Sequence, residues 1–482
     1  MTSSPLDWTG PREAATDPDG PTGRVCAWLE ELTLADVPET VQERAKDVLL
    51  DGVGCALVGA QLPWSRIAVE TALRFEGRGD RSLIGWGRTA PATTAALLNG
   101  TFIQGFELDD FHPAAPLHSA SLVLPALLAC AEERGGATGA ELLLATIAGF
   151  EVGPRAGLTL NGAQMLSRGW HSGAVFGTHA AAATAGVLLK LDAARFEDAF
   201  GLAGTQSAGL MAAQFEAMCK RMHHGFSARN GLFSALMAAG GYTGIKRVFE
   251  REYGGFCSMF GEGHDPKPAE IAGELGARWD TMGIVLKPYA AMGALHPPLD
   301  GIFALMAEEP IRAEDVDHID IQMSHAAYHH GWWPLERPVT PIGAQMNVAY
   351  AVAAAILDGE AMVKQFAPGR INRDDVWALI PKIQAHHNPE FDKGGTATRG
   401  NMLMQVRLTS GRTREIFIAV AKTVSQPLDR AQTIAKFKTL TDGLVTQTRQ
   451  QQLIDTVLGL EAVKGIEELS ALLAPVAEPA FA

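Results

Sequence analysis

The sequence is poor in the features that mark several large classes of protein. It has 5 cysteines in 482 residues, at positions 26, 55, 130, 219 and 257, and no two of them form a CxxC pair. It has no run of lysine and arginine, and its formal net charge is −14. Such a charge repels nucleic acid and anionic membranes, so neither is expected as a partner. We expect reduced core thiols in a cytoplasmic protein.

Long apolar runs are also absent. The longest, such as residues 121–130 and 180–189, reach about half of the roughly 20 residues that a membrane-spanning helix needs. The first twenty residues are polar, acidic and rich in proline and glycine, and they lack the apolar core of a secretion signal. We expect no membrane span, and we expect residues 1–20 to form a flexible arm.

The common catalytic and cofactor motifs are missing as well. There is no HExxH, no Walker loop and no GxSxG. The stretch GVGCALVG at 52–59 has the wrong glycine spacing for a dinucleotide fingerprint and lies inside a helical pattern, so close helix packing explains its glycines better. Three His–His doublets do not indicate a metal, because adjacent residues on a helix face different directions. We therefore predict no cofactor and no metal.

What is present is the composition of a protein with a large core, 47% hydrophobic and 20% charged. Its length favours two domains, because single cores stop growing at about 250–300 residues. Apolar residues at helical spacing predict helices that begin near residues 22, 38 and 91. Further helices are predicted at 119–133, 139–152, 171–190, 193–203, 227–239 and 246–250.

The pattern changes at about residue 283. Residues 318–323 alternate like a strand, and residues 402–420 read as two strands joined at Ser410-Gly411-Arg412. Helical patterns from 346 and over 374–387 lie between them, and helices return near 429 and over 450–460. The predicted fold is mostly α. A helical domain is built from both chain ends (21–282 and 424–482), and an α+β domain is inserted at 283–423.

Four polar clusters interrupt the apolar patterns. Because burying an unpaired charge costs free energy, such clusters are where a functional site is expected. The first, over 106–121, contains Glu107, Asp109, Asp110, His112 and His118. A helix end and a helix cap on a surface loop would explain it equally well.

The second cluster holds His171 at a helix start, where a structural histidine is the more common explanation. The third runs from Lys220 to Gly231 and includes Lys220 and His223; as a basic loop before a helix it could bind an anion, or it could be a solvated turn. The fourth carries Lys287 at the expected domain junction, where ligands often bind.

Five strings resemble the MmgE/PrpD family in their order and spacing. They are ELDDFHPAAPLHSAS, GWHSGAVFG, KRMHHGFSARNG, LKPYAAMG and ERPVTPIGAQMNVAYAVAAAILDG. The family comprises cofactor-free dehydratases, decarboxylases and epimerases that act on small polycarboxylates. The resemblance covers nearly the whole chain, and the forms ELDD-aromatic-H, APLHSAS and GWH-x-GAV are most similar to the aconitate-decarboxylating branch. It implies a homodimer, an inserted lid domain, and an active site between the helical body and the lid.

The resemblance also assigns site residues. The family's catalytic positions fall on His118, Lys220 and His171. Substrate-binding positions are expected at Glu107, Asp109, Phe111, His112, His223 and Lys287. Most members carry Thr at position 111, so Phe111 is a departure that weakens a direct transfer of dehydratase function.

The implied reaction converts cis- or trans-aconitate to itaconate and CO2. Its dienolate needs cations, for which Lys220 and Lys287 with His171 are suited. It also needs a proton donor, for which His118, oriented by Glu107 or Asp109, is our choice. Two alternatives remain open at this point. One is dehydration of a 2-methylcitrate-type substrate, and the other is a non-catalytic helical scaffold.

Overall fold

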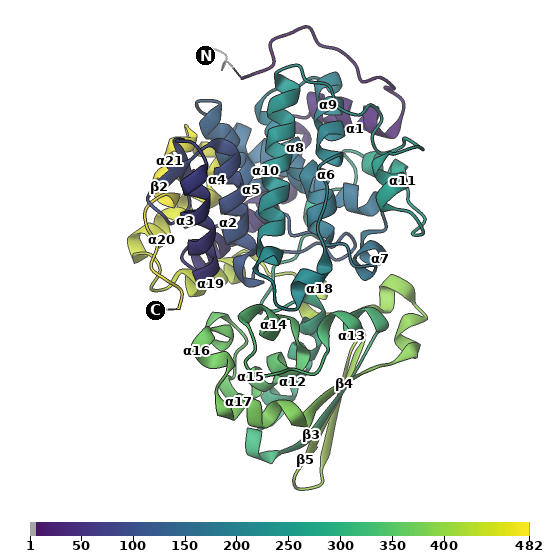
Figure 1. The fold of residues 1–482 in the computed structure, drawn as a ribbon, viewed down its shortest axis with the longest axis vertical. Coiled ribbons are helices and arrows are strands. Elements are labelled where there is room, and N and C mark those ends of the chain that lie inside the picture. The colour runs from purple at the N-terminus through teal and green to yellow at the C-terminus, as the bar shows by residue number, and fades with distance from the viewer. Residues whose placement is uncertain (1–5, 482) are drawn as a thin grey trace.

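The computed structural model describes residues 6–481 and is mostly helical, as the sequence predicts (Figure 1). A short hairpin, β1 (Arg81–Leu83) and β2 (Arg88–Ala90), interrupts the first helices. The helices before residue 283 are α1 (Pro21–Glu31), α2 (Glu39–Ala60), α3 (Pro63–Phe75), α4 (Ala92–Ile103), α5 (Ala120–Glu133), α6 (Gly139–Thr159), α7 (Gly162–Ser167), α8 (Ser172–Leu188), α9 (Ala193–Gly204), α10 (His223–Ala239) and α11 (Phe256–Phe260).

Helix α8 lies at the centre of this part and packs against α5, α6, α9 and α10. Small residues make the close packing possible. A Cβ at Gly231 of α10 would lie 2.3 Å from the backbone oxygen of Thr178 in α8, and a Cβ at Gly225 would lie 2.2 Å from that of Leu97 in α4. Because real Cβ atoms do not approach so closely, α10 can occupy its groove only with glycine at these two positions.

The segment that follows contains the main sheet, with strand order β4-β3-β5-β6. Strand β3 pairs in parallel with β4 and antiparallel with β5, and helices α12 and α15 pack against the strands and each other. Its elements are α12 (His296–Glu308), β3 (Val316–Met323), α13 (His325–Gly331), α14 (Pro341–Met346), α15 (Val348–Asp358), α16 (Pro368–Ile371), α17 (Asp374–Leu379), β4 (Ile383–His387), β5 (Met402–Leu408) and β6 (Thr413–Ile418).

The predicted strand at 318–323 and the predicted hairpin after residue 402 are both confirmed. In the hairpin, Gly411 has a positive φ of 85°, which glycine adopts without a steric penalty.

The chain then returns to the first set of helices. Helices α19 and α20 pack against α2, and Arg430 Nε of α19 donates to Asp47 Oδ1 at 2.7 Å. Figure 1 shows α19, α20 and α21 beside α2 to α4, while α12 to α17 and β3 to β5 lie together at the other end of the molecule. The last helices are α18 (Lys422–Ser425), α19 (Arg430–Thr441), α20 (Gln447–Leu458) and α21 (Ile466–Leu473).

Residues 6–20 of the predicted arm contact the helices. Asp7 accepts a hydrogen bond from Arg134 Nε, Trp8 N donates to Leu189 O at 2.9 Å, and Glu13 N donates to Asp192. Residues 1–5 of that arm lie outside the described part of the chain.

Three local predictions are wrong. Residues 246–250 form turns, because Arg247 has a positive φ of 54° and its N–H donates to Glu197. The helix predicted over 374–387 ends at Leu379. Pro381 cannot continue it, and residues 383–387 become strand β4. The basic segment at 220–225 is no loop, because the 3₁₀ helix Met218–Met222 leads directly into α10.

Four of the five cysteines are free and buried, as expected, but Cys219 is free and exposed, so the prediction that all are core thiols is wrong for that residue. Among the described residues no single helix is long and apolar enough to cross a membrane. Helices α2 and α3 meet the length and composition test only as a pair, with a bend of 81° between them.

Candidate active site

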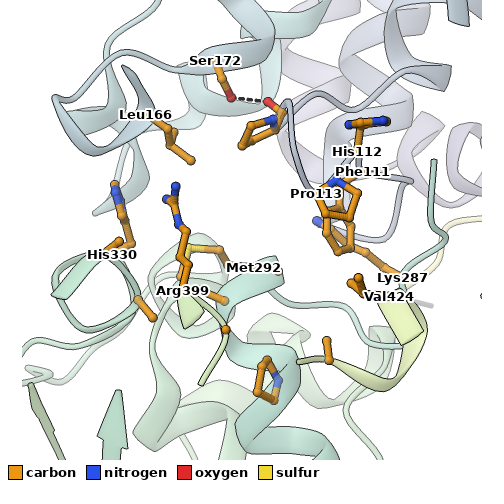
Figure 2. A pocket seen from close by; sticks show the side chains of 18 of the residues that line it. Phe111, His112, Pro113, Leu166, Ser172, Lys287, Met292, His330, Arg399 and Val424 are labelled. Atoms are coloured by element: carbon orange, nitrogen blue, oxygen red, sulfur yellow. Dashed lines mark hydrogen bonds between the residues drawn. The ribbon is translucent and has the colours of Figure 1, made fainter. Parts of the chain in front are cut away.

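A cavity of about 250 Å³ lies between the first helices and the segment that carries the sheet. Figure 2 shows Leu166 and Ser172 on one side of it and His330 and Arg399, from the sheet-bearing segment, on another. Seven of the nine predicted site residues line it, namely Glu107, Phe111, His112, His118, His171, Lys220 and Lys287.

Two lysines share one carboxylate in the wall of this cavity. Lys220 Nζ donates to Glu107 Oε1, and Lys287 Nζ lies 3.2 Å from Oε2 and 3.3 Å from the backbone oxygen of the same residue. All three side chains are buried. Burial would raise the pKa of Glu107, but Lys220 and then Lys287 hold it well below its usual range. Burial lowers the pKa of Lys220, and the Glu107 carboxylate opposes that shift. With both ammonium groups charged, the triad carries one net positive charge, which suits an anionic ligand.

The backbone at Glu107 has an unusual conformation that aims this carboxylate. It follows α4 and the 3₁₀ helix Gln104–Phe106, and it adopts a left-handed conformation with φ of 56°. Such a conformation is uncommon for a residue other than glycine, asparagine or aspartate. Local strain of this kind concentrates at functional sites.

His118 lies beside a second acid. Its Nδ1 is 3.3 Å from Oδ1 of Asp109, which is fully buried. Of the described histidines that line the cavity, only His118 has a carboxylate oxygen within 4 Å. Asp109 can therefore orient the His118 ring toward the cavity, as a general acid requires.

The neighbouring acid, Asp110, has a structural role. Its two oxygens accept from Ser119 N at 2.6 Å and Ala120 N at 2.8 Å, at the start of α5. Burial, and then the nearby Asp109, raise the pKa of Asp110 to about 7. These hydrogen bonds fix the loop that presents His118.

His171 lines the cavity, and its ring contacts those of His223 and His224. His171 Nδ1 is 2.9 Å from His223 Nδ1, and the rings of His171 and His224 stack with centroids 5.1 Å apart. His224 Nδ1 is bonded to Ser121 Oγ at 2.7 Å. Burial, followed by nearby cations, lowers the pKa of His171 well below the usual value, and burial and Lys220 lower that of His223 to about 4. These rings are neutral at pH 7.

The GWHSG motif has a packing reason. A Cβ at Gly173 would lie 2.0 Å from His224 Nε2, so only glycine lets the imidazole stack form.

Phe111 and His112 form the wall opposite Arg399 (Figure 2). The backbone of Phe111 is paired with Val285 by two hydrogen bonds of 2.8 and 2.9 Å, and its ring meets His296 edge-on. His112 Nδ1 accepts from Ala115 N at 3.1 Å, and burial lowers its pKa to about 4. Both residues shape the cavity without adding charge to it.

Two predicted substrate-binding residues, Asp109 and His223, do not line the cavity. Each instead contacts a histidine that does. Of the basic residues at 220–229, only Lys220 reaches the cavity. Arg221 is held by Gly105 and Gln345, and Arg229 bonds the neighbouring Asn230.

Several wall residues were not predicted from the sequence, among them Met211, Met292, His330 and Arg399. Met292 lies in the string LKPYAAMG but was not singled out, and Met211, His330 and Arg399 lie outside the five strings. Arg399 follows a stretch rich in glycine and threonine, and only the fold brings it to the cavity.

No group of three or more His, Cys, Asp or Glu side chains within residues 6–481 is arranged to hold a metal ion. The lining offers two ammonium groups that share the Glu107 carboxylate, one guanidinium, imidazoles and apolar surface. This set of groups suits a small polycarboxylate.

Comparison with known proteins agrees with this chemistry. Residues 23–269 match the MmgE/PrpD N-terminal domain and residues 289–462 match the MmgE/PrpD C-terminal domain. A cis-aconitate decarboxylase-like protein of Aspergillus oryzae is 42% identical over 94% of this chain and 97% of its own length. Cis-aconitate decarboxylase of Aspergillus terreus is 40% identical, over 95% and 97%. The human cis-aconitate decarboxylase is 26% identical, over 94% of each chain. The protein therefore belongs to the MmgE/PrpD family.

Proposed function

We propose that this protein is a carboxy-lyase that converts cis-aconitate to itaconate and CO2 without a cofactor. The observation that carries the proposal is the pairing of a net-positive Glu107–Lys220–Lys287 triad with a carboxylate-backed histidine, His118, in one cavity. Relatives that are about 40% identical over nearly the whole chain are named as cis-aconitate decarboxylases, which supports the same reaction here.

The chemistry explains why these groups are needed. The bond between the CH₂ carbon of cis-aconitate and its carboxylate breaks, and CO2 leaves. The electron pair moves into a new C=C bond, and the former C=C pair moves toward the far carboxylate as a dienolate. Protonation of the former vinylic carbon then gives itaconate. The substrate's own conjugation accepts the electrons, so the protein has only to stabilise charge and deliver one proton.

Each role falls to a group on the cavity wall or to a side chain that contacts such a group. Lys220 and Lys287 stabilise the carboxylate that gains dienolate charge, since ammonium groups close to a developing anion act most strongly where water is excluded. His118 donates the proton and Asp109 holds its ring. His171, neutral and bonded to His223, donates or accepts a hydrogen bond at the substrate.

Phe111 favours decarboxylation over the dehydratase alternative. Dehydration of a 2-methylcitrate-type substrate requires help for a departing hydroxyl, which a Thr side chain at this wall could give. A phenyl ring cannot form that hydrogen bond, but it can cover a planar conjugated acid and exclude water.

Proton NMR tests the reaction directly. The purified protein should convert cis-aconitate or its trans isomer to a product with two terminal-alkene protons. In D₂O, one deuterium should enter the CH₂ that bears the carboxylate. Conversion of 2-methylcitrate with both aconitates untouched would replace the proposal with the dehydratase, and no turnover of any of these acids would favour the scaffold.

We further infer that residues 283–423 act as a lid over a helical body, because cavity residues come from both.

We also infer a homodimer. Of the 13 exposed large apolar side chains in the described chain, 7 fall within residues 210–259, and we take this concentration along the chain to mark a surface that a second subunit covers. Sedimentation should give twice the chain mass of 51.3 kDa, and a monomer at micromolar concentration would contradict the dimer. The expected location is the cytoplasm.

A further inference from the structure

One cation in the cavity belongs to none of the motifs. Arg399 precedes β5 and reaches the cavity from the sheet-bearing segment. Figure 2 shows it beside His330, across the cavity from Phe111 and Lys287. It therefore faces a bound ligand from the side opposite the lysine pair.

Within the described residues, the Arg399 guanidinium has a backbone hydrogen bond but no carboxylate partner. Arg399 Nη1 donates to the backbone oxygen of Ala163 in α7 at 2.5 Å, and the backbone oxygen of Arg399 accepts from Ser324 Oγ at 2.7 Å. Within residues 6–481 no carboxylate oxygen lies within 4 Å of its guanidinium, whereas Lys220 and Lys287 share Glu107. Burial alone lowers its pKa, which remains far above neutrality for a guanidinium.

The titratable side chain beside Arg399 is His330, and it does not supply a negative charge. Burial, and then Arg399 itself, lower the pKa of His330 to about 4, so His330 is neutral at pH 7. A partly buried cation without an anion is unfavourable unless a ligand supplies the anion. The bidentate geometry of a guanidinium makes a carboxylate the matching group.

The proposed reaction narrows down which carboxylate that is. The carboxylate on the CH₂ carbon leaves as neutral CO2, so a tight cation there would oppose the reaction. The far carboxylate receives the dienolate charge and belongs with the two lysines. The carboxylate on the central carbon is retained and gains no charge.

We propose that Arg399 binds the central carboxylate of the substrate and thereby selects tricarboxylates over dicarboxylates. This inference rests on the proposed function for the choice of carboxylate. Because the contact is equally strong in the ground state and the transition state, Arg399 contributes to KM and little to kcat. In this respect it differs from Lys220, which faces the developing charge.

Binding of two inert acids tests the inference without turnover. Tricarballylate carries the central carboxylate, and glutarate is the same five-carbon chain without it. Arg399→Gln should weaken tricarballylate binding about 10- to 100-fold, as expected for the loss of a charge-assisted contact, and glutarate binding by less than about 3-fold. In aconitate turnover it should raise KM by a similar factor and leave kcat within about 3-fold.

Two further variants serve as controls. Lys393→Gln removes a positive charge from the same loop, outside the cavity wall, and should change neither affinity. Arg399→Lys keeps the charge without the planar fork and should lose about 3- to 10-fold for tricarballylate only. The melting temperature of Arg399→Gln shows whether that variant folds. If it does not fold, the binding of both acids to Arg399→Lys tests the inference instead.

Equal weakening of both acids, or no weakening of either, would overturn the inference. Loss of kcat with unchanged KM would do the same. These outcomes are distinct from failure of the proposed reaction. The wild-type protein could release no CO2 from aconitate while Arg399→Gln still weakens tricarballylate binding more than glutarate binding. In that case the proposed reaction is wrong and the role of Arg399 in tricarboxylate binding stands.

Discussion

Lys436 Nζ, in the C-terminal helix α19, donates to the backbone oxygen of Leu108 at 2.8 Å, although 328 residues separate the two in the chain. Leu108 lies between Glu107 and Asp109. The same ammonium group is 2.6 Å from Asp51 of α2, and that carboxylate is the main cause of a raised Lys436 pKa, against the effect of burial. Helix α19 thus holds in place the loop that carries Glu107 and Asp109, the two acids of the candidate site.

Lys436→Met should therefore affect both stability and activity. It leaves Asp51 buried without its partner, which typically costs about 3–5 kcal/mol of unfolding free energy. Urea unfolding measures that loss, and a fall in kcat of the remaining folded protein reports the released loop. Adding Asp51→Asn removes the stranded charge and should restore part of the stability. Unchanged stability in the single variant would contradict this account.

Replacing the proton donor should slow chemistry more than binding. His118→Ala is expected to reduce kcat about 10²- to 10⁴-fold with little change in KM, as for loss of a general acid. Asp109→Asn should reduce kcat less, because the imidazole remains. Steady-state kinetics with aconitate measure both. If His118→Ala keeps near-normal turnover while Lys220→Ala does not, the donor is His171 or Lys220.

Lys220→Ala should damage kcat and KM together, because the same ammonium group meets substrate and dienolate. We expect kcat/KM to fall at least about 10²-fold, the scale of a lost charge-assisted hydrogen bond. Arg229→Gln is the matched control, since Arg229 lies nearby in the chain but outside the cavity wall. A loss in the control as large as in Lys220→Ala would point to general charge rather than to a specific contact.

Activity should not depend on an added cofactor. After exhaustive dialysis against a strong chelator, without pyridoxal phosphate, thiamine or nicotinamide, the rate of CO2 release should stay within about 2-fold of the untreated protein. Loss of turnover that one particular metal ion restores would refute this prediction.

Stability should fall as the pH falls from about 6.5 to 4. Burial lowers the pKa of His179 and His296 to about 3 and that of His112 to about 4, against 6.5 for a free histidine. Below pH 6.5 the unfolded chain therefore binds protons that the folded chain does not. Each such histidine removes about 1.4 kcal/mol of stability per pH unit, and the full contribution is present above pH 6.5.

His179 is the most convenient of these histidines to remove, because it lies among Phe200, Phe249 and Phe256. Between pH 6.5 and 5, His179→Leu should lose about 2 kcal/mol less stability in urea unfolding than the wild-type protein. An identical pH dependence in both proteins would show that His179 binds its proton in the folded state.

Periodicity predicted most of the helices and the hairpin because these elements depend on local patterns. It failed at residues 246–250, where a turn is stabilised by the distant carboxylate of Glu197. The same limit applies to the site. Glu107, Lys220 and Lys287 belong to recognisable strings, but that both lysines share one carboxylate is a tertiary fact. Arg399 has no local signal at all, because its importance comes from facing the cavity across the fold.

The dependence of α2 on α19 has a consequence for how the protein is made. Asp47 and Arg430 are bonded across 383 residues, and Phe437 packs against the glycine at 54. At a synthesis rate of about 5–20 residues per second, one face of α2 leaves the ribosome roughly 20–80 seconds before its covering helix exists. During that interval an apolar surface is open to aggregation. Yield in a cell should accordingly respond to chaperone supply and to growth temperature, even for variants whose finished fold is as stable as the wild type.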